Sequence, residues 1–273
     1  MAADSDDEGS GSFGAGRDRW LSRQANLRTV VRHELVARQL MAHLPAAPSR
    51  VLDVGAGQGT QAIRLARLGH HVVGVEPSAT MRAAFEASAA SEPADVRARL
   101  QVVDGALGRL AASERFDVVC CHGVLMYLEQ AGPAVVELCD LVAPGGVVSL
   151  LARNADGMAL RPGLRRDWAE VLTALDALGQ PEPRYTNEIG VLARADRLEH
   201  LASYVSGRRM HVEAWYGVRV LTDGDDVERP APDEPELGAL LAAEERMGRT
   251  DPYRRLAALV HVVGRRDAVS PTA

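Results

Sequence analysis

The stretch Val51-Leu-Asp-Val-Gly55-Ala-Gly57-Gln-Gly59-Thr60 is the strongest guide to the fold of this chain. A short apolar run over residues 50–54 leads into a glycine-rich turn, and a helical pattern over 60–68 follows at once. Glycines let the backbone bend sharply, and they let a ligand approach the backbone N–H groups. Taken alone, such a turn is also an ordinary strand-to-helix connection.

Apolar runs and helical patterns alternate on both sides of this turn. A helical pattern over residues 18–44 precedes it and ends at Pro45. We expect strands over residues 50–54, 71–75, 100–103, 116–121 and 147–151, and helices over 60–68, 81–90 and 134–141. Strands separated by helices of about ten residues favour parallel β-α-β units and an α/β fold with a doubly wound sheet.

The second half of the chain is less regular. We expect helices over residues 168–178, 194–204 and 236–247, and strands over 210–221 and 258–263. Residues 1–16 are mostly small and acidic, which predicts a disordered tail. One domain over residues 17–266 follows, with a core over 48–152, a substrate lid over 155–190, C-terminal strands and helices over 194–266, and a tail over 267–273. The lid is expected because an insertion after strand five lies above the carboxyl ends of the strands.

Composition excludes several classes of protein. The 273 residues are 47% hydrophobic and 25% charged, which is typical of an ordinary globular chain. Every basic side chain is Arg, so mechanisms that need a Schiff-base or P-loop lysine are excluded. The formal net charge is −6, and we therefore expect no DNA partner.

The three cysteines, Cys120, Cys121 and Cys139, lie in apolar runs without a CxxC pair. We expect buried thiols, no disulfide framework and no metal site. No apolar run reaches 18 residues and the N-terminus lacks an apolar core. These features predict a cytoplasmic protein with no membrane partner.

Glu76 ends the second expected strand, about 20 residues after the glycines. A carboxylate there can accept hydrogen bonds from both hydroxyls of a ribose, although an acidic residue near a helix start is the simpler alternative. A dinucleotide turn would carry Gly or Ala where this chain has Thr60. Asp53 would repel a diphosphate but suits an ammonium or sulfonium group. Both points favour S-adenosylmethionine over NAD.

The pattern Asp53-x-Gly55-x-Gly57-x-Gly59 resembles motif I of the class I S-adenosylmethionine-dependent methyltransferases. Asp104-Gly-Ala106 matches the segment beside the adenine, and Pro144-Gly-Gly146 the turn before strand five. The resemblance covers roughly residues 48–152 and implies a Rossmann-like sheet of seven strands, the last antiparallel, with S-adenosyl-L-methionine as cofactor. The cofactor-binding residues that it implies here are Asp53, Gly55, Ala56, Gly57, Gly59, Glu76, Asp104, Ala106 and Leu107.

Over most of its length the chain is similar to the tRNA 5-carboxymethoxyuridine methyltransferase family. That resemblance places Arg32 on the carboxylate of the cofactor's methionine part and His122 against the cofactor. It implies transfer of a methyl group to an oxygen acceptor, a carboxylate on a modified tRNA uridine. The family's lysine-rich stretch corresponds here to residues 176–185, which carry one basic residue, Arg184, and the loop over 223–236 is acidic. A small-molecule acceptor is therefore the alternative, and a protein that binds the cofactor without catalysis is a third.

Three further residues are candidates for substrate binding. Arg219 either clamps an anionic group or lies on an edge-strand surface, Asn154 either binds a polar group or caps a turn, and Tyr216 either stacks on a flat substrate or fills the core. A carboxylate acceptor is already ionised at neutral pH, because its pKa is about 4, so it needs no general base. No catalytic residue is assigned from the sequence, and the oligomeric state is left open.

Overall fold

The computed structural model describes residues 26–108, 114–187, 190–207 and 209–268. The tail expected over residues 1–16 and most of the tail over 267–273 lie outside the described residues. Within the described part, no helix is both long and apolar enough to cross a bilayer.

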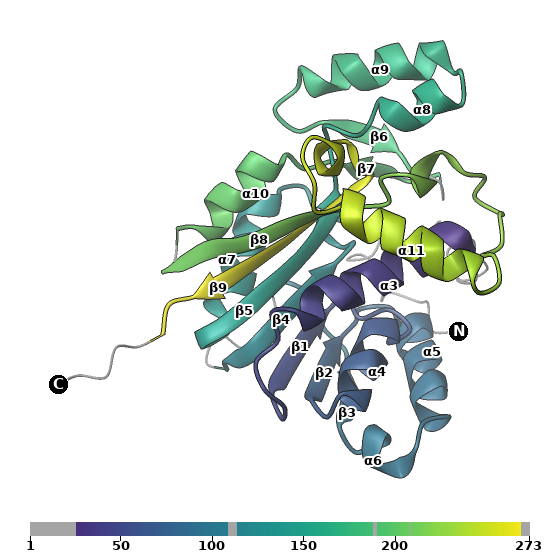
Figure 1. Ribbon diagram of the computed structural model, residues 1–273. Coiled ribbons are helices and arrows are strands. Elements are labelled where there is room, and N and C mark those ends of the chain that lie inside the picture. Colours follow the sequence, from purple (N-terminus) through teal and green to yellow (C-terminus); the bar gives the residue numbers. More distant parts are fainter. Residues whose placement is uncertain (1–25, 109–113, 188–189, 208, 269–273) are drawn as a thin grey trace, which may run out of the picture.

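A seven-stranded sheet organises the chain, in the order β3-β2-β1-β4-β5-β9-β8 (Figure 1). Its strands are β1 (Arg50–Val54), β2 (His71–Val75), β3 (Leu100–Val103), β4 (Phe116–His122), β5 (Val142–Arg153), β8 (Met210–Val218) and β9 (Leu259–Arg266). The first five run parallel, and β9 is antiparallel to both β5 and β8. The predicted doubly wound sheet, with its antiparallel last strand, is confirmed.

Helices cover both faces of the sheet. The helices are α3 (Leu27–Met41), α4 (Thr60–Arg67), α5 (Ala79–Ala90), α6 (Ala94–Arg97), α7 (Ala131–Asp140), α8 (Leu160–Leu164), α9 (Trp168–Leu178), α10 (Leu198–Val205) and α11 (Glu236–Met247). Helices α7 and α10 pack on one face, α3 to α6 on the other, and α11 packs against α3. In β4, Val118 and Cys120 face the α4 side while Val119 and Cys121 face α7, and all four are fully buried. A central strand buried on both faces explains the unbroken apolar run in the sequence.

Local sequence sets the helix ends close to where the patterns predict them. The Ser78 hydroxyl accepts a hydrogen bond from the Met81 N–H and caps α5. Gly69 follows α4 at a φ of 96°, a left-handed conformation that glycine adopts readily at the end of a helix. The three cysteines are buried free thiols, as expected.

Several boundaries differ from the prediction, and three of the differences have a clear physical cause. Strand β5 begins at Val142 rather than 147, because Val142 already pairs with Phe116 and the Pro-Gly-Gly segment forms an irregularity within the strand. The helix predicted over 194–204 begins only at Leu198, because Arg194 belongs to strand β7 (Leu192–Arg194), which pairs with β6 (Arg184–Thr186). Strand β8 ends at Val218, because Arg219 turns into the left-handed region at a φ of 61°.

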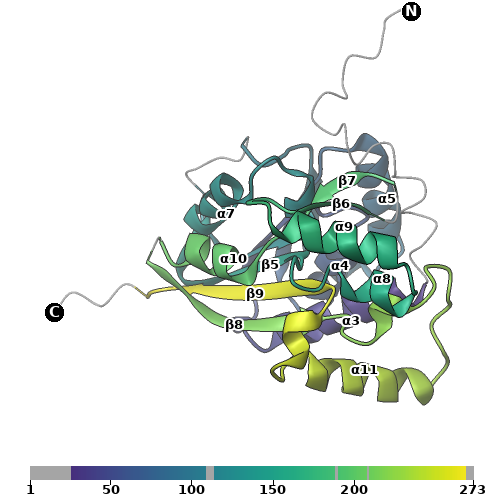
Figure 2. The same cartoon turned by 90° about the horizontal axis from the view of Figure 1, so that it is seen from above.

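The segment between β5 and α10 lies above the carboxyl ends of the parallel strands. Helices α8 and α9 and the β6–β7 hairpin form this cover (Figures 1 and 2). It includes residues 155–187, for which a lid is predicted, and it forms one wall of the cavity described below.

Candidate active site

The glycine-rich turn after β1 adopts backbone angles that other residues rarely take. Gly55, Gly57 and Gly59 have φ values of 72°, 58° and 84°. A Cβ atom on Gly59 would lie 2.5 Å from the ring of Phe85, and one on Gly55 would lie 2.2 Å from Val124. Both the conformation and the close packing therefore require glycine at these positions.

Glu76 is tied directly to this turn. Its carboxylate is almost completely buried, with one oxygen accepting from the Gly57 N–H at 3.0 Å and the other from the Ser78 N–H at 2.9 Å. Burial raises the pKa of Glu76, while these two N–H groups and Arg82 oppose the rise. Each oxygen keeps a second lone pair, so an oriented carboxylate at this strand end can still accept from a diol.

A first cavity, of about 70 Å³, opens against the turn. It is lined by Arg32, His33, Val36, Asp53, Gly55, Ala56, Gly57, Gln58, Thr60, Gln61, His122 and Leu151. The structure thus brings together six of the predicted cofactor residues, which come from α3, β1, the turn and β4. Gly59 belongs to the same turn, and Glu76 is bonded to it.

The charged groups around this cavity suit a ligand that carries both positive and negative groups. Burial, together with the charge of the neighbouring Glu76, raises the pKa of Asp53 to about 7. A cationic ligand would favour the ionised carboxylate. Burial and the charge of Arg32 lower the pKa of His33 to about 2 and that of His122 to about 3, so both rings are neutral at physiological pH. The residues present therefore fit a cofactor that carries an ammonium, a sulfonium and a carboxylate group.

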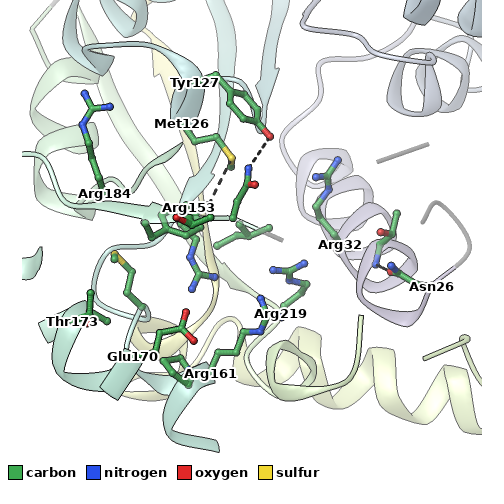
Figure 3. Close-up of a pocket in the computed structure, with 18 residues that line it drawn as sticks. Asn26, Arg32, Met126, Tyr127, Arg153, Arg161, Glu170, Thr173, Arg184 and Arg219 are labelled. Carbon is green, nitrogen blue, oxygen red and sulfur yellow. Dashed lines mark hydrogen bonds between the residues drawn. The ribbon is translucent and has the colours of Figure 1, made fainter. Parts of the chain in front are cut away.

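A second and larger cavity, of about 360 Å³, adjoins the first and shares Arg32 with it. It is lined by the described residues Asn26, Thr29, Arg32, Met126, Tyr127, Arg153, Met158, Arg161, Pro162, Glu170, Thr173, Ala174, Arg184, Tyr185, Thr186, Asn187, Arg219 and Leu259. Figure 3 shows the guanidinium groups of Arg153, Arg161 and Arg219 converging in one part of the cavity, with Arg184 pointing away from them. The lining contains five arginines and one acidic residue, Glu170, so the cavity attracts anions.

Asp223 does not line the cavity itself, but its carboxylate bonds to two of the lining arginines and to Arg28. Its carboxylate accepts from Arg28 at 2.7 Å and Arg219 at 2.7 Å, and from Arg153 at 3.4 Å. Burial raises the pKa of Asp223, but Arg219, Arg153 and Arg28 outweigh it and hold that pKa well below its usual range. Three buried guanidinium charges face one carboxylate, so positive charge remains for a ligand.

Arg153 and Arg219 also retain unused donors. The Nε atom of each is buried and has no hydrogen-bond partner within the described part of the chain. A buried charged donor without a partner is costly, and an anionic ligand would remove that cost. Glu244, itself fully buried, accepts from the N–H groups of residues 220–222 and so holds the turn that presents Arg219.

Two of the predicted substrate residues do not reach this cavity. The Tyr216 hydroxyl bonds to His43 Nε2 at 2.7 Å, beneath α3, because the alternation along β8 turns its ring to that face of the sheet. Tyr216 therefore matches the core-filling alternative rather than stacking on a substrate. The Asn154 amide donates to the carbonyl groups of Arg255 and Ala257, both at 2.8 Å, which matches the turn-holding alternative rather than substrate binding.

The residues predicted to lie beside the adenine line neither cavity. Asp104, Ala106 and Leu107 follow β3, next to the strand that ends at Glu76. The Asp104 side chain is exposed and pairs with Arg82 at 3.1 Å. Their contact with the base stays a prediction. No group of three or more His, Cys, Asp or Glu side chains that could hold a metal occurs among the described residues.

Sequence reasoning missed Arg153, Arg161 and the buried role of Asp223. Asp223 stands in an acidic loop, and no local pattern sets it apart from its neighbours there. Only the packing of that loop against α3 and β5 shows it to be a counter-ion.

Comparison with known proteins agrees with this geometry. The family described as "Methyltransferase domain" matches residues 52–150, which include the glycine turn and Glu76. This chain is an S-adenosylmethionine-dependent methyltransferase. The methyltransferase is 27% identical over 235 residues to the tRNA 5-carboxymethoxyuridine methyltransferase of Escherichia coli (strain K12), covering 84% of each chain. It is also 30% identical over 167 residues to a ubiquinone biosynthesis O-methyltransferase of Methylobacterium nodulans, covering 56% of this chain and 65% of the relative.

Solved structures share the fold of the methyltransferase. The 1,6-didemethyltoxoflavin-N1-methyltransferase of Burkholderia thailandensis, solved with 1,6-didemethyltoxoflavin and S-adenosylhomocysteine, aligns with a TM-score of 0.57 at 18% identity. That alignment covers 98% of this chain and 92% of the other. An S-adenosylmethionine-dependent methyltransferase from Mesorhizobium loti aligns with a TM-score of 0.56 at 18% identity, covering 84% and 96%.

Proposed function

We propose that this methyltransferase transfers the methyl group to a carboxylate oxygen of its acceptor, and that Arg153 and Arg219 hold that acceptor. The observation that carries the proposal is the arginine-lined cavity, which meets the cofactor cavity at Arg32. Guanidinium groups bind carboxylates through paired, charge-assisted hydrogen bonds. The acceptor in this proposal is an anion whose oxygen also serves as the nucleophile.

The chemistry needs little from the protein beyond alignment. The bound cofactor supplies a methyl group that is already activated by the positive charge on sulfur. A carboxylate has a pKa of about 4 and is ionised at neutral pH, so no general base is required. His33 and His122 have pKa values lowered to about 2 and about 3, so either ring is a poor proton acceptor. What the chain supplies is proximity and orientation, together with exclusion of water.

The segment of α8, α9 and the β6–β7 hairpin is placed to exclude water from the cavity. Arg161 from α8, Glu170 from α9 and Arg184 from β6 all line the cavity from the segment above the strands. We propose that this segment acts as the lid over the acceptor, as predicted for residues 155–190. A cavity of about 360 Å³ lies within the ordinary range for small-molecule sites, roughly 300–1,000 Å³.

The carboxylate can be carried by a small molecule or by a modified nucleoside in tRNA, and one experiment separates the two. The purified enzyme is incubated with cofactor labelled in its methyl group and with either the tRNA fraction or the small-molecule fraction of a bacterial extract. The fraction that gains label identifies the carrier. Mild base then distinguishes the acceptor atom, because a methyl ester releases its label as methanol while an ether or N-methyl group does not. Label that withstands base would overturn the carboxylate assignment.

Arg219→Ala tests the residue that we place on the acceptor. Loss of a hydrogen bond to a charged group costs about 1.5–3 kcal/mol, so kcat/KM should fall by roughly 10- to 100-fold. Arg229→Ala is the matched control, because Arg229 is exposed and its side chain pairs with Asp225 outside the cavity. Equal activity of the two variants would remove Arg219 from the acceptor site.

A further inference from the structure

A line of buried polar side chains crosses the face of the sheet beneath α3. Gln39, Ser149 and His261 are each fully buried, and they come from α3, β5 and β9. Three short hydrogen bonds link them in series to His122 at the end of β4. Burying a neutral polar group costs free energy unless its donors and acceptors are satisfied. In a buried row of hydrogen bonds, each group can therefore act as donor or acceptor in only one consistent pattern.

The donor and the acceptor of each hydrogen bond in this row can be assigned by starting at Gln39. The Gln39 amide Nε2 donates to the carbonyl of Gly217 at 3.4 Å, which turns its Oε1 toward His261 Nδ1 at 2.7 Å. Since Oε1 can only accept, Nδ1 of His261 carries a proton. Burial, with His122 and His43 nearby, lowers the pKa of His261 well below its usual value, so the ring is neutral and its Nε2 is bare.

The protons of Ser149 and His122 are assigned in the same way, up to the cofactor cavity. Bare Nε2 of His261 accepts from the Ser149 hydroxyl at 2.7 Å. That hydroxyl has one proton, so toward His122 Nε2, at 2.8 Å, it can only accept. His122 therefore carries its proton on Nε2, and its other nitrogen, Nδ1, is a bare acceptor. Nδ1 has no hydrogen-bond partner among the described residues, and the His122 ring lines the cofactor cavity.

We propose that Gln39, His261 and Ser149 are positioning residues that hold His122 in its Nε2–H form, so that Nδ1 accepts a hydrogen bond from the cofactor's ammonium group. The inference concerns the cofactor cavity and does not depend on the carboxylate acceptor proposed above. A bare ring nitrogen repels a carboxylate and attracts an N–H donor. The methionine part of the cofactor offers both an ammonium and a carboxylate. Arg32, a pure donor in the same cavity, suits the carboxylate. The ammonium has three N–H donors, so it can bond to His122 Nδ1 as well as to the Asp53 carboxylate in that cavity.

Binding of the product S-adenosylhomocysteine tests this directly, because it needs no acceptor and no turnover. The comparison ligand is the same thioether with hydrogen in place of its amino group. In Ser149→Ala, Nε2–H of His122 loses its acceptor and the ring is free to carry its proton on Nδ1. We expect affinity for the product to fall about tenfold, equal to ~1.4 kcal/mol, by titration calorimetry. Affinity for the deaminated ligand should stay within about twofold, since that ligand has no ammonium to lose.

Two controls separate positioning from folding. Ser49→Ala removes another buried hydroxyl, one that bonds to the Ala46 carbonyl at the opposite end of β1, and it should leave both affinities unchanged. Ser149→Thr keeps the hydroxyl and should retain the preference for the aminated ligand. If Ser149→Ala weakens both ligands equally, or weakens neither, the proposal is overturned.

A second measurement uses the unaltered chain and does not depend on any variant folding. In protein labelled with ¹⁵N in its histidines, the ring-nitrogen resonances report which nitrogen carries the proton. The signals of His122 are assigned by their loss in His122→Asn. We expect Nε2 protonated and Nδ1 bare, with the Nδ1 resonance moving on addition of S-adenosylhomocysteine but not of the deaminated ligand. The opposite tautomer would overturn the proposal.

Discussion

Asp223 is the residue whose removal should reveal how the arginine cavity is held together. It is the counter-ion of Arg28, Arg153 and Arg219, and its side chain is only 8% exposed. Asp223→Asn preserves the shape of the side chain but removes the negative charge. The substitution leaves three buried guanidinium groups without the carboxylate that pairs them.

The size of the effect follows from that burial. Removing one partner of a buried ion pair costs ~3–5 kcal/mol, and Asn keeps one acceptor, so we expect a loss near the lower limit, about 3 kcal/mol. At about 2–4 °C per kcal/mol for chains of 150–250 residues, the melting temperature should fall by roughly 6–12 °C. Urea unfolding followed by circular dichroism measures the same change as a lower midpoint.

The pH dependence supplies a second readout with a definite sign. Because the folded-state pKa of Asp223 lies well below its unfolded value, its stabilisation is complete above about pH 4 and is lost as pH falls further. The stability gap between Asp223→Asn and the unaltered chain should therefore narrow below pH 4. Asp225→Asn, which removes an ion pair with the exposed Arg229, should cost under about 1 kcal/mol. A loss from Asp223→Asn no larger than that of the control, or a gap that does not change with pH, would refute the reasoning.

Three other substitutions test the cofactor site. Gly59→Ala forces a Cβ into the ring of Phe85 at a positive φ, so it should destabilise the fold by about 1–3 kcal/mol more than Gly108→Ala, which has the same φ and open space. Glu76→Gln should weaken S-adenosylhomocysteine binding at least tenfold by calorimetry, because hydrogen bonds to a charged acceptor are worth about 1.5–3 kcal/mol. Asp53 has a folded pKa raised to about 7, so its burial costs stability increasingly as pH rises from about 4 to 7. Asp53→Asn should accordingly gain stability relative to the unaltered apo protein over that range in urea titrations, and a constant difference would contradict the raised pKa.

Most of the core could be predicted because its signals are local. The apolar runs of β1, β2 and β3 are bounded by glycines and prolines, and their predicted limits agree with the structure. Gly55, Gly57 and Gly59 predict the turn, because glycine adopts those backbone angles without the steric strain that other residues would have. Glu76 could be found in the same way, since its distance along the chain from the turn is set by one helix and one strand.

The arginine-lined cavity could not be predicted, because it depends on contacts between distant segments. Arg219 was placed on an edge strand, but the strand ends one residue earlier and a left-handed turn aims the side chain at Asp223. Tyr216, three residues before it, was assigned to the substrate, yet the two-residue period of β8 places it beneath α3. One residue of register decides which face a strand side chain occupies, and the pattern around β8 does not fix that register.

The amino-acid sequence by itself determined the doubly wound sheet, the glycine turn and the identity of the cofactor, because each depends on residues close together along the chain. Only the tertiary structure decided which arginines share a cavity, that Asp223 is a buried counter-ion rather than part of an exposed acidic loop, and that Gln39, His261 and Ser149 form one hydrogen-bonded line to His122. These groups lie up to 222 positions apart. Their meeting is set by the order of strands in the sheet and by the packing of α3 across it, which no local pattern of residues encodes.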